Sequence, residues 1–309
     1  MLPNLFLAGF PKCGSTSLYN TLSQHPDVFP SAFEESPVFS HDLESRTHLH
    51  LLEMDQYPSY AGEKYILNGH PVTILSAPAL ASIKKHVDNP KFVVSLRDPI
   101  RRAISNYNYM RYRFFENRSI DDVLEAEFGE ATAWLTDYSG GPLIDFHYHA
   151  SNYGPYLENL AAMFGWDSIK ILQFETFFDP ERRDEQITDL MRFLDIVPFD
   201  TGAVHSNPTR PTEVVLAGPN RIRTGGKTIS FERAVFCRDA ATNKVERALL
   251  GPSDHTWNWF KAYTAATAAD VATVTAAHSE KFRPIFEYVA DHVSPGFVDA
   301  WRGMAAEDV

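Results

Sequence analysis

The sequence predicts an α/β fold with a central parallel sheet and helices on both faces. Three stretches support this prediction, because each runs from a short apolar segment through a turn into a segment of helical periodicity. They begin at Asn4, Lys91 and Ser168. Ligands of such sheets bind at the carboxyl ends of the strands, so the three strand ends are expected to face one crevice.

The first stretch opens the chain. Residues 4–10, "NLFLAGF", are typical of a strand buried on both faces. A glycine-rich turn follows, and then Leu18 and Leu22 recur at helical spacing until Pro26 ends the segment. Backbone N–H groups in such a turn, together with the positive end of the helix dipole, converge on a bound anion.

The other two stretches repeat this order. In residues 91–115 a β-branched strand stops at Asp98-Pro99 and a helix begins. In residues 168–196 a strand runs to about Phe174, and a helix covers roughly residues 181–194.

The rest of the chain gives weaker signals. Residues 198–259 show little periodicity and are expected to form loops over the crevice. The alanine-rich residues 261–293 are expected to form terminal helices that pack on the sheet.

Composition narrows the possible partners. The 309 residues include 28 Lys and Arg against 40 Asp and Glu, a formal charge of −12, which argues against nucleic acid and anionic membranes as partners. No window approaches the ~18 uncharged apolar residues that a spanning helix needs. The first apolar segment has no basic stretch before it, and two cysteines do not make a disulfide framework. The sequence therefore predicts a soluble, cytoplasmic protein.

The turn at residues 9–17 is the most informative feature. Gly9 and Gly14 have the spacing of a nucleotide-triphosphate loop, G-x-x-x-x-G-K-[ST], but Ser15 occupies the lysine position and Lys12 lies inside the loop. The turn therefore suits phosphate, whereas the usual triphosphate chemistry is disfavoured. Cys13 has no catalytic partner spaced around it, so a small residue that lets the backbone curl is favoured over a nucleophile.

Three pieces of the chain resemble the sulfotransferases that use 3′-phosphoadenosine 5′-phosphosulfate (PAPS), in motif closest to the heparan sulfate and bacterial branch. "GFPKCGSTSLYNTL" is similar to the family's loop for the 5′-phosphosulfate. "LRDPIRRAISNY" is similar to its 3′-phosphate motif, in which an arginine and a later serine hold the phosphate, here Arg97 and Ser105. "ILQFETFFDPERR" and "LMRFLDI" resemble the downstream strand and helix. The resemblance covers about residues 5–196.

The resemblance implies a P-loop-type three-layer fold. It implies one domain over residues 1–309, with a motif-bearing core at about 4–196 and loops and terminal helices at about 197–309. PAPS is the implied donor, no metal is expected, and Lys12 is placed to stabilise the leaving phosphate. The backbone and side-chain groups expected to surround the 5′-phosphate come from Cys13, Gly14, Ser15, Thr16 and Ser17.

A general base must take the proton from the acceptor. "FEESPVFSHDL" resembles the E-x-x-F-F stretch of the heparan sulfate branch, and aligning Phe39 places Glu35 at the catalytic position. Val38 replaces one aromatic residue of that stretch, and Glu34 is a neighbouring alternative. His70 is a rival base, because the cytosolic small-molecule branch uses histidine.

Two further lysines follow from the resemblance. "GEKYILNGHPV" resembles an EK-x-P segment whose lysine contacts the transferring group, which makes Lys64 a candidate although Tyr65-Ile66 replaces the usual small residue and proline. "RTGGKTIS" has the composition of a late loop that closes over the 3′-phosphate, which makes Lys227 a candidate. An ordinary flexible turn is the alternative for Lys227.

Two other function classes stay open. A P-loop kinase of a small metabolite would need magnesium and a lysine after Gly14, and the lysine is missing. A nucleotide-binding module without catalysis is the other. The charge of −12 fits poorly with a long polyanionic sugar, so the expected acceptor is a small neutral or cationic molecule with a hydroxyl or amine. The aromatic residues of 106–115 and 255–260 are candidates for its pocket, with core packing as the alternative.

Overall fold

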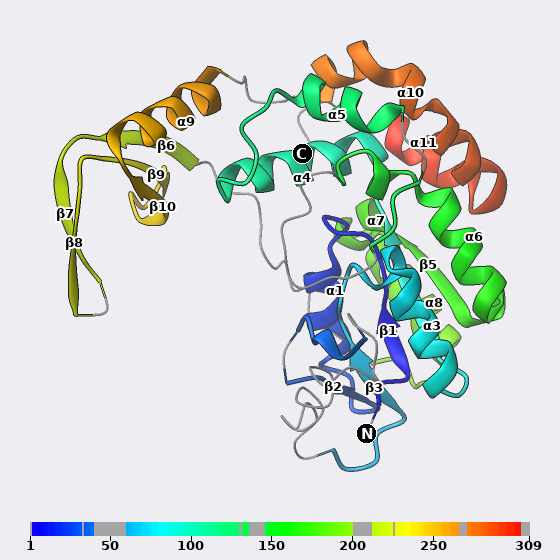
Figure 1. Cartoon of the computed structure of the whole chain (residues 1–309). Helices are drawn as coiled ribbons and strands as arrows, with labels where there is room; N and C mark the ends of the chain where they lie inside the picture. Colours follow the sequence, from blue (N-terminus) through cyan, green and yellow to red (C-terminus); the bar gives the residue numbers. More distant parts are fainter. Residues whose placement is uncertain are drawn as a thin grey trace.

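The computed structural model describes residues 2–32, 34–39, 60–129, 132–135, 146–199, 212–224, 226–265 and 271–303. At its centre lies a parallel five-stranded sheet with helices around it (Figure 1). The predicted α/β fold is confirmed. In sheet order the strands are β2 (Val28–Pro30), β3 (Tyr65–Asn68), β1 (Leu5–Leu7), β4 (Lys91–Leu96) and β5 (Ile169–Gln173).

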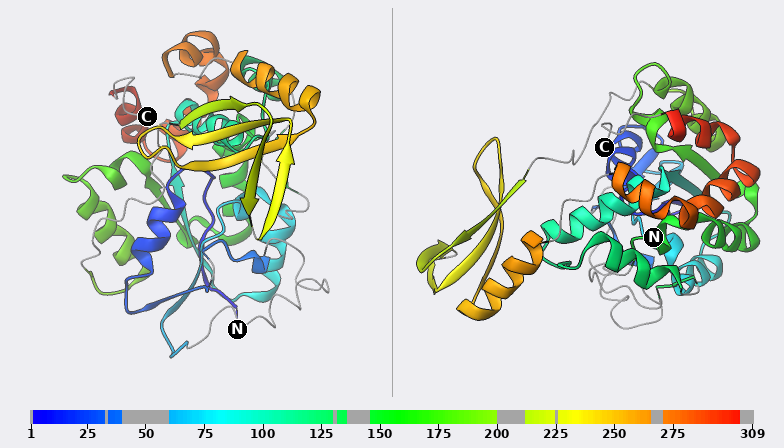
Figure 2. Two further views of the ribbon diagram at one scale, coloured as in Figure 1. Left: turned by 90° about the vertical axis from the view of Figure 1, so that its left-hand side faces the viewer. Right: turned by 90° about the horizontal axis from the view of Figure 1, so that it is seen from above.

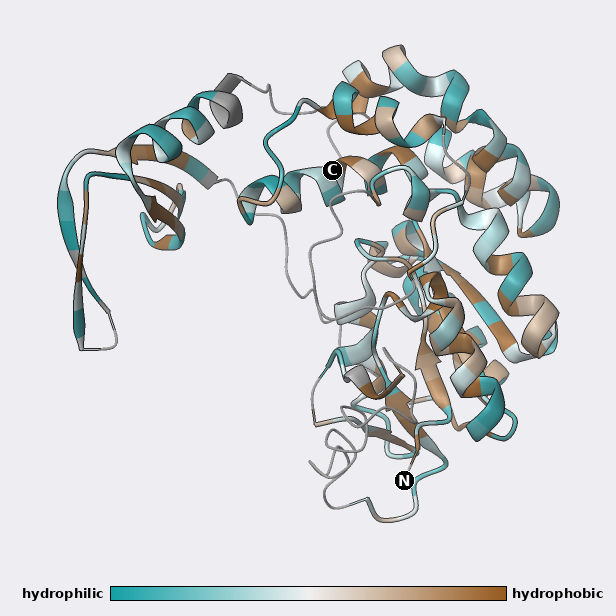
Figure 3. Cartoon of the chain, viewed as in Figure 1, coloured by the Kyte–Doolittle hydropathy of each residue, from teal (hydrophilic) through white to brown (hydrophobic). Residues whose placement is uncertain are grey.

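Helices cover both faces of this sheet. Leu5 and Leu7 of β1 point to a core shared with α1 (Ser15–Leu22) and α8 (Arg183–Leu194). Phe6 points the other way, because successive side chains of a strand alternate between faces. That second core is shared with α3 (Ala77–His86), α4 (Pro99–Tyr112) and α6 (Tyr153–Phe164). Figure 3 shows the apolar strands between the two helical layers.

Shorter elements connect these layers. They are α5 (Ile120–Phe128), α7 (Phe174–Phe178) and the 3₁₀ turns η1 (Pro37–Phe39), η2 (Thr73–Leu75), η3 (His149–Ser151) and η4 (Trp166–Ser168).

The junction of β4 and α4 shows how the sequence places a strand end. Asp98 is the N-cap of α4, and its Oδ1 accepts the backbone N–H groups of Ile100 and Arg101, both at 2.9 Å. Pro99 stands at the first helical position, where no N–H is needed. The strand therefore stops at the Asp98-Pro99 pair, as predicted.

The last two helices of the described residues are α10 (Val271–His292) and α11 (Pro295–Gly303). Terminal helices were predicted, but α10 packs against α4, α6 and α11 and not on the sheet as expected. Its buried face includes Phe282 and Ile285, which join the core on the α4 side. The helix forms an outer layer over other helices (Figure 1).

The expectation of loops over residues 198–259 is wrong from residue 212 onward. The chain there forms an antiparallel sheet, a two-stranded ribbon and one helix. These elements are β6 (Thr212–Ala217), β7 (Asn220–Thr224), β8 (Lys227–Phe231), β9 (Arg233–Asp239), β10 (Val245–Gly251) and α9 (Ser253–Ala265). Figures 1 and 2 show this unit to one side of the parallel sheet. It meets the end of α4, where the Phe114 and Trp259 ring centroids lie 5.0 Å apart.

Candidate active site

The ends of β1, β4 and β5 lie together at the carboxyl edge of the parallel sheet, as the predicted crevice requires. Arg97, directly after β4, donates from Nη1 to the carbonyl oxygen of Lys12 in the turn after β1, at 3.3 Å. The Arg97 guanidinium carbon also lies 4.5 Å from the ring centroid of Phe174, directly after β5. The ends of β1, β4 and β5 are therefore in direct contact.

Gly14 shapes the turn after β1. Its φ of 78° lies in the left-handed region, and an added Cβ would lie 2.9 Å from Cδ2 of Phe174. Gly14 is also the N-cap of α1 and makes no side-chain capping hydrogen bond. The turn therefore closes tightly against β5 and presents the start of α1, with partly exposed Ser15 and Thr16, to the crevice.

Arg102, which sequence reasoning did not single out, fastens the turn from behind. Its side chain is fully buried, and Nη1 donates to the carbonyl oxygen of Pro11 at 3.2 Å. Nε donates to Oγ of Ser151 at 2.6 Å, and Nη2 donates to the carbonyl oxygens of Phe146 and His147. Arg102 thus has a structural role. The sequence gives no local signal that distinguishes this buried arginine from an exposed arginine on a helix.

Lys12 lies in a strongly positive environment. Burial, followed by the charges of Arg97 and Arg102, lowers the pKa of Lys12 to about 8. Its Nζ lies 4.2 Å from the ring centroid of Tyr109 on α4. The positive charges of Lys12 and Arg97, with Arg102 behind the turn, favour an anion at this end of the sheet.

Arg97 has donor capacity to spare. Its side chain is only 8% exposed, and its Nε has no hydrogen-bond partner within the described part of the chain. The hydroxyl of Tyr153 donates to the Arg97 carbonyl oxygen at 2.7 Å and fixes the backbone. The carboxylate of Asp98 caps α4, so the guanidinium is available to an anionic ligand.

Cys13 lies inside the fold, 1% exposed. Burial raises the pKa of its thiol to about 11. A thiol that stays protonated near neutral pH is a poor nucleophile, which favours the interpretation of Cys13 as a small packing residue. Ser17, on the first turn of α1, is buried as well.

Glu35 is exposed and lies near Lys12, at the same end of the sheet. The Asn68 side chain, at the end of β3, donates to the Ser36 carbonyl oxygen at 3.1 Å, and Gly69 allows the Glu34 carbonyl oxygen to approach, since an added Cβ would lie 2.6 Å from it. Loss of hydration, followed by the charge of Glu34, raises the pKa of Glu35, and the Lys12 ammonium opposes that rise. The Glu35 carboxyl is thus electrostatically coupled to Lys12.

The remaining predicted residues fall in different places. Ser105 is partly exposed on α4, roughly 9 Å along the axis from the helix start. His70 is buried just beyond β3, where its carbonyl oxygen accepts the Thr73 hydroxyl at 2.9 Å. Lys227 is exposed on the β7–β8 ribbon, which Figure 1 shows extending away from the parallel sheet. The structure does not bring Lys227 to the turn after β1.

The prediction for Lys64 is wrong. Lys64 precedes β3, and because the sheet is parallel it lies at the amino edge, opposite the crevice. Its Nζ donates to Oδ2 of Asp195 at 2.8 Å, and its carbonyl oxygen accepts from the Asn4 side chain at 3.2 Å. The sequence segment resembled a motif, but the strand direction carries the lysine away from the reacting group.

The aromatic runs divide between core and surface. Tyr107 is fully buried, whereas Tyr109 is 37% exposed beside Lys12. In the second run Trp257 stacks on Phe260 within α9, at 5.7 Å between centroids. Tyr109 is therefore the aromatic residue that borders the crevice.

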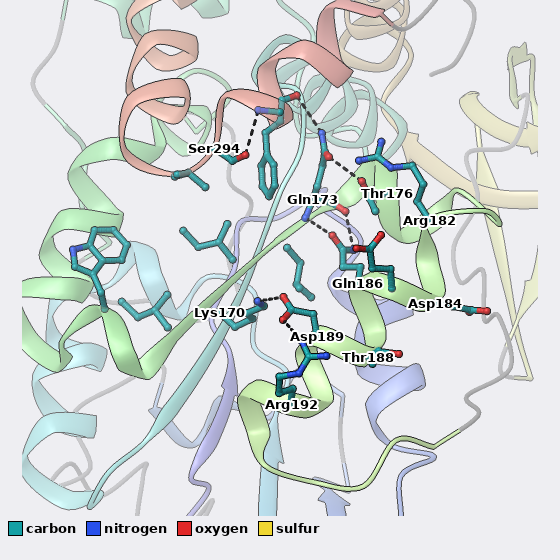
Figure 4. Close-up of a pocket in the computed structure, with 18 of the residues that line it drawn as sticks. Lys170, Gln173, Thr176, Arg182, Asp184, Gln186, Thr188, Asp189, Arg192 and Ser294 are labelled. Carbon is teal, nitrogen blue, oxygen red and sulfur yellow. Dashed lines mark hydrogen bonds and ion pairs between the residues drawn. The ribbon is translucent and has the colours of Figure 1, made fainter.

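A cavity of about 890 Å³ lies elsewhere, along β5 between α8 and the connection of α10 to α11 (Figure 4). Gln173, Gln186 and Asp189 are among its lining residues, and none of the predicted site residues is. It borders the edge strand of the sheet and does not belong to the crevice.

Among the described residues, no three His, Cys, Asp or Glu side chains are grouped as metal ligands. No helix within the described ranges combines the length and apolarity that crossing a membrane requires.

The chain is similar to known sulfotransferases. Residues 2–207 match the sulfotransferase domain family. Membrane-associated sulfotransferase kil1 of Dictyostelium discoideum is 26% identical over 118 residues, 38% of this chain and 25% of that protein. Human carbohydrate sulfotransferase 15 is 24% identical over 231 residues, 59% and 39% of the two chains. Mouse heparan sulfate glucosamine 3-O-sulfotransferase 3B1 is 29% identical over 115 residues, 34% and 26% of the two chains.

These alignments span a quarter to two-fifths of the length of the curated relatives. The crystal structure of a sulfotransferase from Alicyclobacillus acidocaldarius superimposes with a TM-score of 0.53 and 21% identity, covering 68% of this chain and 87% of that one. This likeness agrees with the fold described above. Since the family match covers more than half of the chain, the protein belongs to the sulfotransferase domain family.

Proposed function

We propose that the protein moves a sulfuryl group from PAPS to a hydroxyl or amine of a small acceptor. The observation that carries the proposal is the convergence of Lys12, the spare donors of Arg97 and the uncapped start of α1 where β1, β4 and β5 end. Family membership supports sulfuryl transfer as the reaction class.

In this proposal Lys12 and the turn act on the leaving group. When the acceptor oxygen or nitrogen forms its bond to sulfur, the bond between sulfur and the bridging oxygen breaks, and negative charge grows on the 5′-phosphate. The turn already packs against β5 before the reaction, so Lys12 and the N–H groups at Gly14, Ser15 and Thr16 stabilise that charge with little reorganisation of the backbone.

Glu35 serves as the general base. It accepts the proton that the acceptor loses as the new bond to sulfur forms. The direction of its pKa shift suits this role, because a general base works best when its pKa lies near the working pH. Glu34 and His70 remain the alternatives.

Arg97 and Ser105 hold the 3′-phosphate. The guanidinium of Arg97 stays charged at any working pH and offers Nε, which has no partner within the described residues, to a phosphate oxygen. Ser105 adds a hydroxyl from α4.

The test is a calorimetric titration with 3′-phosphoadenosine 5′-phosphate, with ATP as the competing ligand. Wild type should bind the 3′-phosphorylated nucleotide and ignore ATP, and Arg97→Ala should abolish that binding. Arg302→Ala, an exposed arginine on α11, is the matched control and should bind as wild type does. Equal or better binding of ATP would favour a kinase of a small metabolite over a sulfotransferase.

Transfer itself is measured with radiolabelled PAPS and a panel of small hydroxyl and amine acceptors. Saturable transfer that is lost in Lys12→Ala supports the proposal. Binding of the nucleotide without transfer to any acceptor would favour a non-catalytic nucleotide-binding module.

A further inference from the structure

The C-terminal helix α11 is fastened to the end of β5. The indole N–H of Trp301 donates to Oε2 of Glu175 at 2.7 Å, and the side chain of Gln173 donates to the Phe297 carbonyl oxygen at 3.1 Å, a bond visible in Figure 4. Trp301 is only 3% exposed. Residues 295–303 lie beyond residues 2–207, the part of the chain that matches the family. A helix outside the family match therefore contacts the end of β5, next to the residues proposed to bind the donor nucleotide.

Glu175 also bonds to the turn that carries Arg97. Its second oxygen, Oε1, accepts the backbone N–H of Asp98 at 3.0 Å. Asp98 follows Arg97 directly, and the residue before Glu175 is Phe174, whose ring lies under the Arg97 guanidinium. The Glu175 carboxyl thus links α11 to the backbone directly after Arg97, and its chain neighbour Phe174 contacts the Arg97 guanidinium.

The charge of Glu175 depends on these contacts. Burial raises the pKa of Glu175, and the N–H groups of Asp98 and Trp301 together with the charge of Arg97 oppose that rise. A buried carboxylate that loses one of its donors either turns toward another donor or takes up a proton. Either change weakens the hydrogen bond from the Asp98 N–H to Glu175 and so loosens the turn after β4.

We infer that Trp301 is a positioning residue for the 3′-phosphate, acting through Glu175 on Arg97 and Asp98. The inference rests on the proposed function, because it takes Arg97 to be the 3′-phosphate ligand. It assigns a role in donor recognition to the C-terminal helix.

The variants follow from the contacts. Trp301→Phe removes the N–H donor and keeps an aromatic ring among Phe286 and Phe297, whose centroids lie 5.9 and 6.2 Å from the Trp301 ring. Phe286→Leu is the matched control, because it weakens the same packing and leaves the hydrogen bond to Glu175 intact. Glu175→Gln keeps one acceptor oxygen for two N–H donors, so it must lose either the bond from the Trp301 indole or the bond from the Asp98 backbone.

The readout is the ratio of dissociation constants for adenosine 5′-monophosphate and 3′-phosphoadenosine 5′-phosphate, measured by calorimetry beside thermal unfolding. Trp301→Phe and Glu175→Gln should each lower this ratio about tenfold, and the double variant should lower it no further. Phe286→Leu should lower the melting temperature and keep the wild-type ratio. A general loss of structure would weaken both nucleotides alike, so the ratio isolates the 3′-phosphate.

The outcomes separate the two claims. A wild type that discriminates between the nucleotides, with an unchanged ratio in Trp301→Phe and Glu175→Gln, would overturn the role of Trp301 and leave the proposed function standing. A ratio that falls equally in Phe286→Leu would also overturn it, because packing alone would then explain the effect. A wild type that does not distinguish the nucleotides would overturn both.

Discussion

Burial and the guanidinium groups of Arg97 and Arg102 disfavour the protonated form of the Lys12 side chain. Its pKa of about 8 therefore lies below that of an ordinary lysine. A phosphate beside Nζ offsets these effects and raises the pKa in the complex. Nucleotide binding is then coupled to proton uptake whenever the free protein has lost the Lys12 proton.

The sign of this coupling gives a prediction for binding. Below pH 8 Lys12 is already protonated in the free protein and adds no pH dependence. Above pH 8 the affinity for 3′-phosphoadenosine 5′-phosphate should fall, by at most about tenfold per pH unit, until the pKa of the complex is reached. Calorimetry at a series of pH values measures the fall. Lys12→Arg, which stays charged, should show a flat profile, and a flat wild-type profile would contradict the coupling.

Glu35 and Glu34 differ by one position and provide a matched pair. Glu35→Gln removes the proposed base, so kcat should fall by about 10²- to 10⁴-fold, whereas the affinity for the donor nucleotide should stay as in wild type. Glu34→Gln should keep kcat within a few-fold. A large fall in Glu34→Gln with an active Glu35→Gln would assign the base to Glu34 instead.

The pH profile of kcat tests the same assignment. A base must be deprotonated to act, so kcat should decline as the pH falls through the raised pKa of Glu35. The acid limb of the profile should disappear in Glu35→Gln. An identical acid limb in that variant would point to another titrating group, with His70 as the first to examine.

The turn after β1 and the helix α4 act as one unit at the scale of elements. Arg102 holds the turn and residues 146–151 together with one fully buried side chain. Arg102→Met fills similar volume but leaves these acceptors without a donor, so the free energy of unfolding should fall by about 3 kcal/mol. Denaturant unfolding measures the change. Arg192→Met, at a side chain 73% exposed, should change it by less than about 0.5 kcal/mol.

The elements predictable from sequence are those with local signals. β1, β4 and β5 are apolar runs that end at glycine or proline turns, and their helices keep a regular apolar spacing. β8 and β10 were missed because most of their residues are exposed, so no apolar alternation marks them.

The site residues, too, divide into those with a local sequence signal and those without one. Lys12, Glu35 and Arg97 stand in short stretches whose order the sequence preserves, and the structure brings them to one crevice. The bond between Trp301 and Glu175 joins residues 126 positions apart, which no local pattern reveals. Lys64 shows the opposite case, in which a local pattern is present but misleading. The motif does not say at which end of the strand its lysine lies.

Charge over the whole molecule bears on the acceptor. The formal charge of −12 repels a polyanion at long range, although the crevice itself is positive near Lys12 and Arg97. A donor nucleotide reaches that local field as a small ligand, whereas a sulfated polysaccharide must lie across the acidic surface as well. The proposed acceptor is therefore small and neutral or cationic.

This argument predicts a salt dependence that separates acceptor classes. At low salt kcat/KM for a neutral acceptor should exceed that for heparan sulfate, and the difference should narrow as salt rises, because exposed charges are screened beyond about 10 Å at 0.1 M ionic strength. Transfer from radiolabelled PAPS to both acceptors, at two salt concentrations and fixed donor, measures it. The neutral acceptor controls for salt effects on the donor. If heparan sulfate were the better acceptor at low salt and lost its advantage as salt increased, attraction to a local basic surface would outweigh the net charge, and the acceptor would have to be sought among polyanions.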